Sequence, residues 1–189
     1  MTTTSHAEEK LKELGLSLPA LPTPGGNYAV DRRALERRDD VLVYSSEALN
    51  AAMEVIGRVS VELFAASDAQ DTDFTASIID VYPDGRAVVL GARIVGIIRA
   101  RYRHSFEKTG LLTPGKVEKY NIDLGHIAHS FEPGHRVRVE ISSSAVPLYS
   151  PNQNTGNPVA TDTEWRVAHQ TIYHDAQYPS AVLLPVITR

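Results

Sequence analysis

The sequence contains no cysteine among its 189 residues. This absence excludes a disulfide framework, zinc sites built from thiolates and a cysteine nucleophile. The chain also lacks an excess of positive charge, because 19 Lys and Arg residues stand against 23 Asp and Glu residues, for a net charge of −4. A general attraction to nucleic acids or to anionic membranes is therefore not expected, and nucleic acid is excluded as a partner.

Long apolar runs are missing as well. The longest, at residues 87–92, stops at Arg93 and is far shorter than the roughly 20 residues that a membrane-spanning helix needs. The first part of the chain carries Glu8, Glu9 and Lys10 where a secretion signal needs an apolar stretch. We therefore expect a cytoplasmic protein without a membrane partner.

Glycine motifs that carry well-known chemistry are absent too. No two of the twelve glycines are four residues apart, as the G-x-S-x-G nucleophile turn requires, or two apart, as the G-x-G-x-x-G dinucleotide motif requires. The stretch Gly110–Lys116 resembles the start of a phosphate-binding loop. Val117, however, replaces the Ser or Thr that binds magnesium, and the residues that follow alternate like a strand. We expect no cofactor.

Histidines and a serine cluster are the remaining candidates for chemistry. His126 and His129 are three residues apart, so in a strand they point to opposite faces and predict no metal site. The cluster Ser142–Ser144 has no spacing to His129 or to His135 that indicates an activated serine. We predict no catalytic residue and no metal ligand in this chain, with an independent enzyme of unfamiliar type as an alternative.

An acidic turn lies between two of the strands expected below. Its carboxylates, Asp68, Asp71 and Asp73, are oxygen ligands of the kind that calcium prefers. The interpretation that we favour is a simple turn, in which aspartate side chains bond to nearby backbone.

From residue 41 onward, apolar and polar residues alternate with the period of a β-strand, and turn residues separate the runs. The clearest example is Arg136–Ile141, where three β-branched residues alternate with three charged ones. Pro83-Asp84-Gly85 predicts a tight turn. The expected strands are 41–44, 58–67, 73–82, 87–90, 94–102, 116–124, 136–142, 168–174 and 181–187. About nine strands without a long helical pattern predict an all-β domain, either a β-sandwich or a jelly roll.

The first forty residues do not follow this pattern. A capping box at Ser5 precedes apolar residues at helical spacing, which predicts a short helix in an N-terminal extension of residues 1–21. Proline and glycine predict an extended linker over 22–40, whose charged end, 31–40, is expected to be a solvated connecting segment. The β-sandwich domain is assigned to 41–189.

One segment, residues 143–167, is long and has no periodicity. Loops beyond about 15 residues are uncommon unless they are functional or disordered, so contacts are expected here. Aromatic side chains on or beside this loop suit stacking on a sugar or an acyl group, or packing beneath the loop. The candidate binding or interface residues are Pro147, Tyr149, Asn154 and Trp165.

Several stretches, taken together and in order, resemble one family. They are 39–47, 66–76, 80–86, 99–103, the pair Pro114-Gly115, 135–144, 154–156, 173–175 and 185–187. This arrangement resembles the C-terminal, non-catalytic domain of the X-Pro dipeptidyl-peptidase and cocaine esterase family of serine hydrolases. The resemblance covers about residues 22–187 and implies a jelly-roll β-sandwich of the galactose-binding-like type.

The resemblance also implies a partner. In that family this domain packs against an α/β-hydrolase domain that carries the catalytic Ser, Asp and His, and it helps to close one side of the active site. None of those triad residues maps onto this chain. The expected function is accessory packing, with a hydrolase domain on a separate chain or a second copy of this chain as the partner. The alternative is a stand-alone module that binds a carbohydrate or another ligand.

Overall fold

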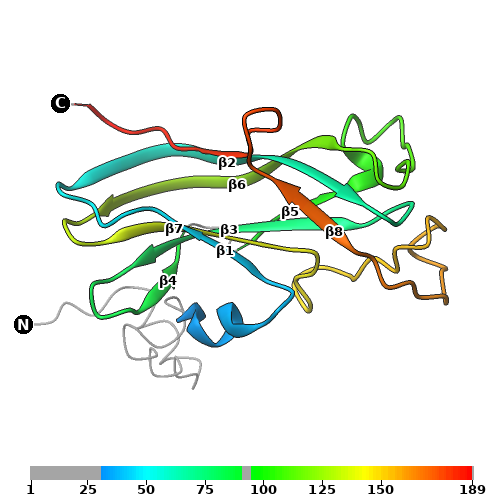
Figure 1. The fold of residues 1–189 in the computed structure, drawn as a ribbon, viewed down its shortest axis with the longest axis horizontal. Helices are drawn as coiled ribbons and strands as arrows, with labels where there is room; N and C mark the ends of the chain where they lie inside the picture. The colour runs from blue at the N-terminus through cyan, green and yellow to red at the C-terminus, as the bar shows by residue number, and fades with distance from the viewer. Residues whose placement is uncertain (1–30, 91–94, 189) are drawn as a thin grey trace, which may run out of the picture. The chain divides into compact units, whose positions relative to one another are not determined.

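The computed structural model describes residues 31–90 and 95–188. The helix expected near Ser5 and residues 22–30 of the expected linker lie outside the described residues. Within the described part, helical turns are limited to η1 (Arg32–Arg37) and η2 (Ala100–Tyr102), and none is long and apolar enough to cross a membrane. Two antiparallel sheets supply the rest of the regular structure, which confirms the prediction of an all-β sandwich (Figure 1).

Each sheet is organised around one long central strand. The first sheet has the order β1 (Leu42–Ser45), β7 (Arg136–Ser142), β3 (Asp73–Val81) and β4 (Ala87–Val89), and β5 (Gly96–Arg99) also pairs with β3. The second has the order β6 (Glu118–Phe131), β2 (Met53–Ser67) and β8 (Gln170–Tyr173), and β9 (Ala181–Leu183) also pairs with β2. The short strands β1, β8 and β9 therefore lie at sheet edges.

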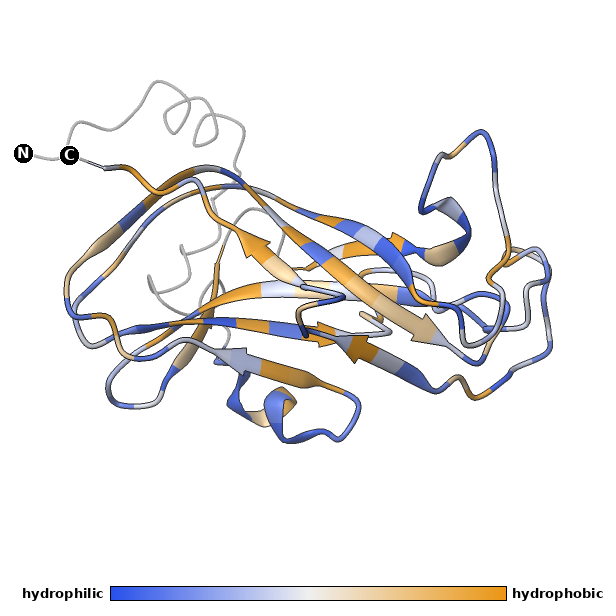
Figure 2. Cartoon of the chain, turned by 45° about the horizontal axis from the view of Figure 1, so that its top comes forward, coloured by the Kyte–Doolittle hydropathy of each residue, from blue (hydrophilic) through white to orange (hydrophobic). Residues whose placement is uncertain are grey.

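The main core is formed by alternate residues of the long strands, as the sequence pattern predicts. Val61 and Leu63 of β2 belong to the same buried cluster as Phe74 and Ile78 of β3. Figure 2 shows hydrophobic and hydrophilic residues alternating along several strands. The rings of Phe74 and Tyr120 lie 4.7 Å apart between the sheets. Since every second side chain of a strand points to one face, this pattern turns one face of each sheet toward the other.

Strand β6 continues to Phe131, whereas the expected range 116–124 ends earlier, because a bulge interrupts the alternation on which that expectation rests. The register with β2 shifts by one residue, so Leu124 has no cross-strand partner, and Gly125 that follows has a φ of 80°. Ile122 is buried before the bulge and Ile127 after it. An extra residue reverses the alternation, so a strict period of two ends at the bulge although the strand continues.

Most of residues 31–40 are exposed, as expected of a solvated segment, but two of their charged side chains pack against β7. Arg32 of η1 donates to Glu140 of β7, with Nη2 and Oε2 2.5 Å apart and the side chains 14% and 3% exposed. Glu36 accepts from Arg138 of β7, with Oε2 and Nη1 2.6 Å apart. Arg32 and Glu36 therefore find partners on the charged face of β7, which fixes η1 against the first sheet, whereas Asp31 pairs with Arg33 and Arg38 with Asp40 inside the segment.

Gly96 is the point where β5 approaches β6 most closely. A Cβ at this position would lie 2.5 Å from the carbonyl oxygen of Asp123 and 2.7 Å from Cδ2 of Leu124. We expect Gly96→Ala to lower the free energy of unfolding by about 1–3 kcal/mol, because a backbone carbonyl moves only if β6 moves. The control is Gly110→Ala, whose nearest neighbours are 4.0 Å away. Urea denaturation compares the two, and equal midpoints would contradict the prediction.

Candidate docking surface on the long loop

Two buried carboxylates at the start of β3 anchor the long loop. Asp71 and Asp73 are 0% and 2% exposed. The side-chain amide of Asn152, in the loop, donates to Asp71 Oδ2 at 2.9 Å and to Asp73 Oδ1 at 2.8 Å. One loop residue thereby bonds to both carboxylates, and the middle of the loop is held against the first sheet.

Two arginines complete this network. Arg101 pairs with Asp71, with Nε and Oδ2 2.7 Å apart, and Arg99 pairs with Asp73 through two bonds of 2.9 and 3.0 Å. Arg99 also donates to the carbonyl oxygen of Ser150 at 3.1 Å, and Arg101 donates to a second loop carbonyl at 2.7 Å. Because a guanidinium carries several donors in a fixed plane, each arginine links a carboxylate to the loop backbone.

The acidic turn is thus a structural anchor, and its carboxylates bond to distant residues rather than to the nearby backbone that the favoured interpretation expected. The third carboxylate, Asp68, accepts from the backbone and the ring of His169 at 2.9 and 3.0 Å. These two bonds lower the pKa of Asp68. Across residues 31–90 and 95–188 no group of three or more His, Cys, Asp or Glu side chains is arranged to hold a metal ion.

Sequence reasoning missed the arginines as partners of this turn, although a signal exists. Asp71-x-Asp73 and Arg99-x-Arg101 have the same spacing, and the antiparallel pairing of β3 with β5 places Asp73 opposite Arg99. Opposite charges directly across an antiparallel pair stabilise it. Matched i, i+2 charge pairs on neighbouring strands could therefore have predicted the contact.

The four candidate residues of the loop lie in different settings. The hydroxyl of Tyr149 donates to the carbonyl oxygen of Val95 at 3.1 Å. Asn154 has a φ of 63°, and its side-chain amide donates to the carbonyl oxygen of Arg166 at 2.9 Å. These two residues shape the loop. Pro147, which follows a cis peptide bond, and Trp165 are instead exposed.

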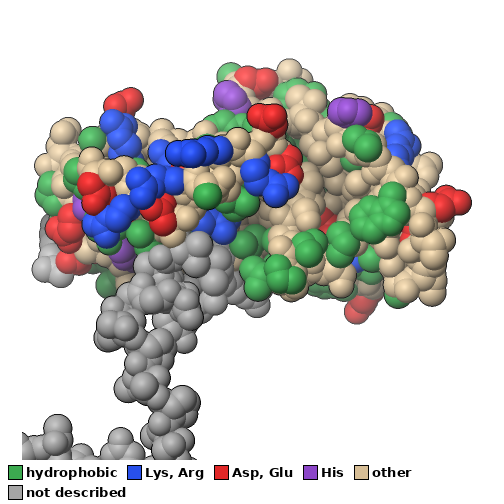
Figure 3. All heavy atoms as spheres, turned by 90° about the horizontal axis from the view of Figure 1, so that it is seen from below, with side chains coloured by type: hydrophobic (Ala, Val, Ile, Leu, Met, Phe, Trp, Pro, Cys, Tyr) green, Lys and Arg blue, Asp and Glu red, His purple; other side chains and the backbone are tan. Residues whose placement is uncertain are grey.

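Large apolar side chains project from this loop into solvent. Val146 is 60% exposed, Leu148 59%, Trp165 66% and Val167 77%. Together with Pro147 they are called the loop surface below. Figure 3 shows hydrophobic side chains in the centre and on the right of the face seen from below, whereas most Lys and Arg side chains lie on the left. Single exposed apolar residues are ordinary, but a group of them marks an interaction site.

The two arms of the loop meet at one cavity. Ser144 of the first arm and Ala168 at the end of the second both line a cavity of about 430 Å³, together with Leu42 of β1. A second cavity of about 300 Å³ lies between η1 and the first arm, with Leu35 and Pro147 in its walls. The loop therefore borders the start of β1 at the first cavity, and the part of the loop surface around Pro147 borders η1 at the second.

A buried carboxylate also holds two of the histidines considered above. Asp80, which is 1% exposed, contacts His129 Nε2 at 3.0 Å and His135 Nδ1 at 2.8 Å. In the part of the chain that the structure describes, neither imidazole bonds to a serine or threonine hydroxyl. The cluster Ser142–Ser144 lines the cavities beside the loop instead. This geometry joins strands and offers no activated nucleophile.

Comparisons with known proteins match these features. A family model described as the X-Pro dipeptidyl-peptidase C-terminal non-catalytic domain matches residues 2–183, and so starts earlier than the resemblance seen over 22–187. Cocaine esterase from Rhodococcus sp. (strain MB1 Bresler) is 42% identical over 167 residues, which cover 87% of this chain and 29% of that protein.

Two solved structures share the fold over a similar part of this chain. An aminopeptidase from the marine sediment archaeon Thaumarchaeota archaeon has a TM-score of 0.81 at 35% identity, over 90% of this chain and 29% of its own. An α-amino acid ester hydrolase has a TM-score of 0.79 at 31% identity, over 85% of this chain and 28% of its own. The chain therefore spans under a third of each of these relatives. It belongs to the family of X-Pro dipeptidyl-peptidase C-terminal non-catalytic domains.

Proposed function

We propose that this chain is an accessory domain that packs through its loop surface against an α/β-hydrolase catalytic domain. The observation that carries the proposal is a set of large apolar side chains, each more than half exposed, on a loop pinned by buried ion pairs. Its family membership and its share of about 29% of longer relatives support a role beside another domain.

The loop surface has the composition of an interface centre. Trp165 offers the large, rigid contact area that dominates binding energy in many interfaces. Val146, Leu148 and Val167 add aliphatic area without charge, and covering such area contributes about 25 cal/mol per Å². In this proposal the partner supplies the reacting groups, and this domain forms part of the wall around them. The partner is either a separate hydrolase chain or a second copy that shields the same surface.

Mixing experiments with a hydrolase domain test the proposal. The probe is the catalytic part of the Rhodococcus cocaine esterase, expressed without the segment that this chain matches. We expect a stable complex by light scattering and a faster ester hydrolysis than with the catalytic part alone. Trp165→Asp is expected to weaken the complex by at least about tenfold, since it places a charge in an apolar contact.

Phe106→Asp provides the matched control, because Phe106 is 81% exposed on a different loop. Its complex is expected to keep full affinity. Failure to form a complex, or equal losses in the two variants, would argue against the loop surface as the docking site. Light scattering of the chain alone tests the second-copy form, since a dimer there must also dissociate in Trp165→Asp.

An exposed tryptophan also suits the alternative function, a carbohydrate-binding module. Sugars stack on the faces of exposed aromatic rings, and Trp165 is 66% exposed. It is the single tryptophan of the chain, so its fluorescence reports on this position alone. A saturable fluorescence change on adding a sugar, without binding to the hydrolase domain, would favour the alternative over accessory packing.

A further inference from the structure

A groove of about 510 Å³ opens between the two sheets and shares Ile141 and Ile172 with the cavity of about 430 Å³ at the long loop. Its floor is made of inward-facing residues of both sheets, Val61 and Leu63 of β2 and Val139 and Ile141 of β7. These four residues are between 1% and 5% exposed and belong to the main core. The groove therefore reaches the interior of the sandwich.

The walls of the groove are apolar and incompletely covered. Eight hydrophobic residues pack against the main core while only partly buried, and six of them line this one groove. They are Leu49, Met53, Val137, Ile172, Val182 and Leu184. Among the described residues, most of the incompletely buried apolar side chains next to the core therefore lie at this groove. Filling the groove with an apolar molecule removes this surface from water, which is favourable at about 25 cal/mol per Å².

Polar groups gather at the mouth. Tyr44 of β1 and His174, which follows β8, meet edge to face across the opening, with ring centroids 5.6 Å apart. Within residues 31–90 and 95–188 neither the phenol nor the imidazole bonds to another protein group. A phenol is protonated at neutral pH and can donate, and burial raises the pKa of Tyr44 further. The mouth therefore offers two free donors beside an apolar slot.

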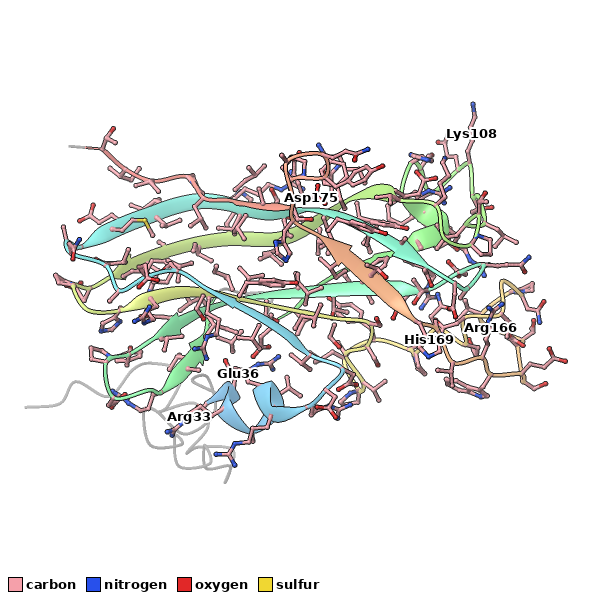
Figure 4. All side chains as sticks on the ribbon, viewed as in Figure 1. Arg33, Glu36, Lys108, Arg166, His169 and Asp175 are labelled. Carbon is pink, nitrogen blue, oxygen red and sulfur yellow. The ribbon has the colours of Figure 1, made fainter. Side chains whose placement is uncertain are left out.

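The neighbouring acid does not compete for this position. Asp175 lies in the turn after β8 (Figure 4), where its carboxylate accepts from the backbone N–H groups of Gln177 and Tyr178, both at 2.8 Å. Both bonds go to Oδ1, so this oxygen of Asp175 is engaged in the turn.

The width of the groove decides which kind of molecule can enter it. Facing sheets pack about 10 Å apart, a distance that their own side chains fill, whereas a helix with its side chains is about 10–12 Å across. A helix from a partner protein therefore cannot reach the floor between Leu63 and Val139, but a single hydrocarbon chain can. The volume of about 510 Å³ falls within the range of roughly 300–1,000 Å³ that is typical of small-molecule sites.

We propose that this groove binds an aliphatic carboxylate with one unbranched chain. The chain lies between the sheets against the floor residues, and the carboxylate accepts hydrogen bonds from the Tyr44 hydroxyl and from a ring N–H of His174. A few placed polar groups at the rim of an apolar cavity are the usual design of such a site. None of the loop-surface residues lines the groove, so this site and the docking role proposed above are tested by different variants.

Calorimetric titration with sodium decanoate, kept below its micelle concentration, tests the site. We expect one molecule to bind per chain. Val182→Phe fills the groove from β9 and is expected to weaken binding by at least about tenfold. Leu183→Phe makes a comparable change at the next residue, which is 47% exposed and does not line the groove. This control is expected to bind decanoate like the unmodified chain.

Tyr44→Phe tests the hydrogen bond to the carboxylate head group separately from the contact with the hydrocarbon chain, because it adds no bulk to the groove. It keeps the ring and removes one donor, so decanoate is expected to bind about three- to tenfold more weakly. Decyltrimethylammonium, with the same chain and a positive head, is expected to bind more weakly than decanoate. Circular dichroism checks that each variant is folded. If Val182→Phe is not folded, the decanoate affinity of Tyr44→Phe alone decides.

Four results of these titrations would overturn the proposal. They are no heat with decanoate, equal affinities of Val182→Phe and Leu183→Phe, an unchanged affinity of Tyr44→Phe, and a cation that binds as well as the carboxylate. A dimer that buries the groove and leaves no room for decanoate, detected by light scattering, would overturn it too.

Discussion

Replacing Asp71 with alanine is expected to lower the free energy of unfolding by about 3–5 kcal/mol, the usual cost of removing one partner of a buried ion pair. Asp71 is fully buried. Without it, the guanidinium of Arg101, which is 12% exposed, and the amide of Asn152 lose an acceptor within 3 Å. Asn152 keeps Asp73 as an acceptor and Arg101 keeps a loop carbonyl, but the buried positive charge of Arg101 loses its carboxylate partner. Urea denaturation followed by circular dichroism measures the loss.

The same substitution should also release the loop. Asn152 and Arg101 connect Asp71 to the loop. Backbone amides of the loop are therefore expected to exchange faster in the variant than in the unmodified chain, with a smaller change in β2. Asp68→Ala is the matched control, because Asp68 lies on the same turn but bonds to the exposed His169. Little change in stability is expected from it. Similar losses in the two variants would contradict the anchoring role of Asp71.

Arg32→Ala is the second change for which we expect a large effect, a loss of about 3 kcal/mol or more at neutral pH. Glu140 is 2% exposed, and Arg32 is its partner at 2.5 Å. Removal of the arginine leaves a carboxylate in the first sheet with its countercharge gone. Glu140→Gln in the same chain is expected to restore much of the loss, because a neutral amide needs no countercharge.

The pH dependence of this loss follows from the direction of the shift. Burial raises the pKa of Glu140, and Arg32 offsets part of that rise. A carboxyl with a raised pKa contributes stability that is fully present below its ordinary value of 4.5 and is lost as the pH rises through the raised pKa. Because Arg32→Ala raises this pKa further, the deficit should be small at about pH 4 and should grow as the pH rises toward neutrality. A loss of stability in Arg32→Ala that does not change with pH would contradict this prediction.

Much of the fold could be predicted from local patterns. The alternation in Arg136–Ile141 predicted β7 with its inner and outer faces, and Pro83-Asp84-Gly85 forms the expected turn, in which Asp84 accepts from the backbone N–H of Arg86 and Gly85 has a φ of 86°. The ends of strands were harder to predict. Gly57, with a φ of 137°, lies inside β2, and the pattern expected the strand to start after it.

The site was less predictable than the fold, for a physical reason. Alternation reports which side of a strand is buried, but it does not report which residue lies opposite. The partners of Asp73 and Asp80 come from strands 26 and 49 residues away in the chain, and Glu140 pairs with Arg32 across 108 residues. Trp165 and Pro147 could be singled out because their loop lacks a pattern, whereas its anchors required the register of β3 with β5.

The anchoring of the long loop has a thermodynamic consequence for any partner that covers it. Ordering a flexible segment during association costs conformational entropy for each residue and side chain that becomes fixed. Here Asn152, Arg99 and Arg101 fix the loop backbone as part of folding. The entropy cost of ordering the loop is therefore part of folding and not of binding. A partner then binds with higher affinity than it would bind a loop that becomes ordered only in the complex.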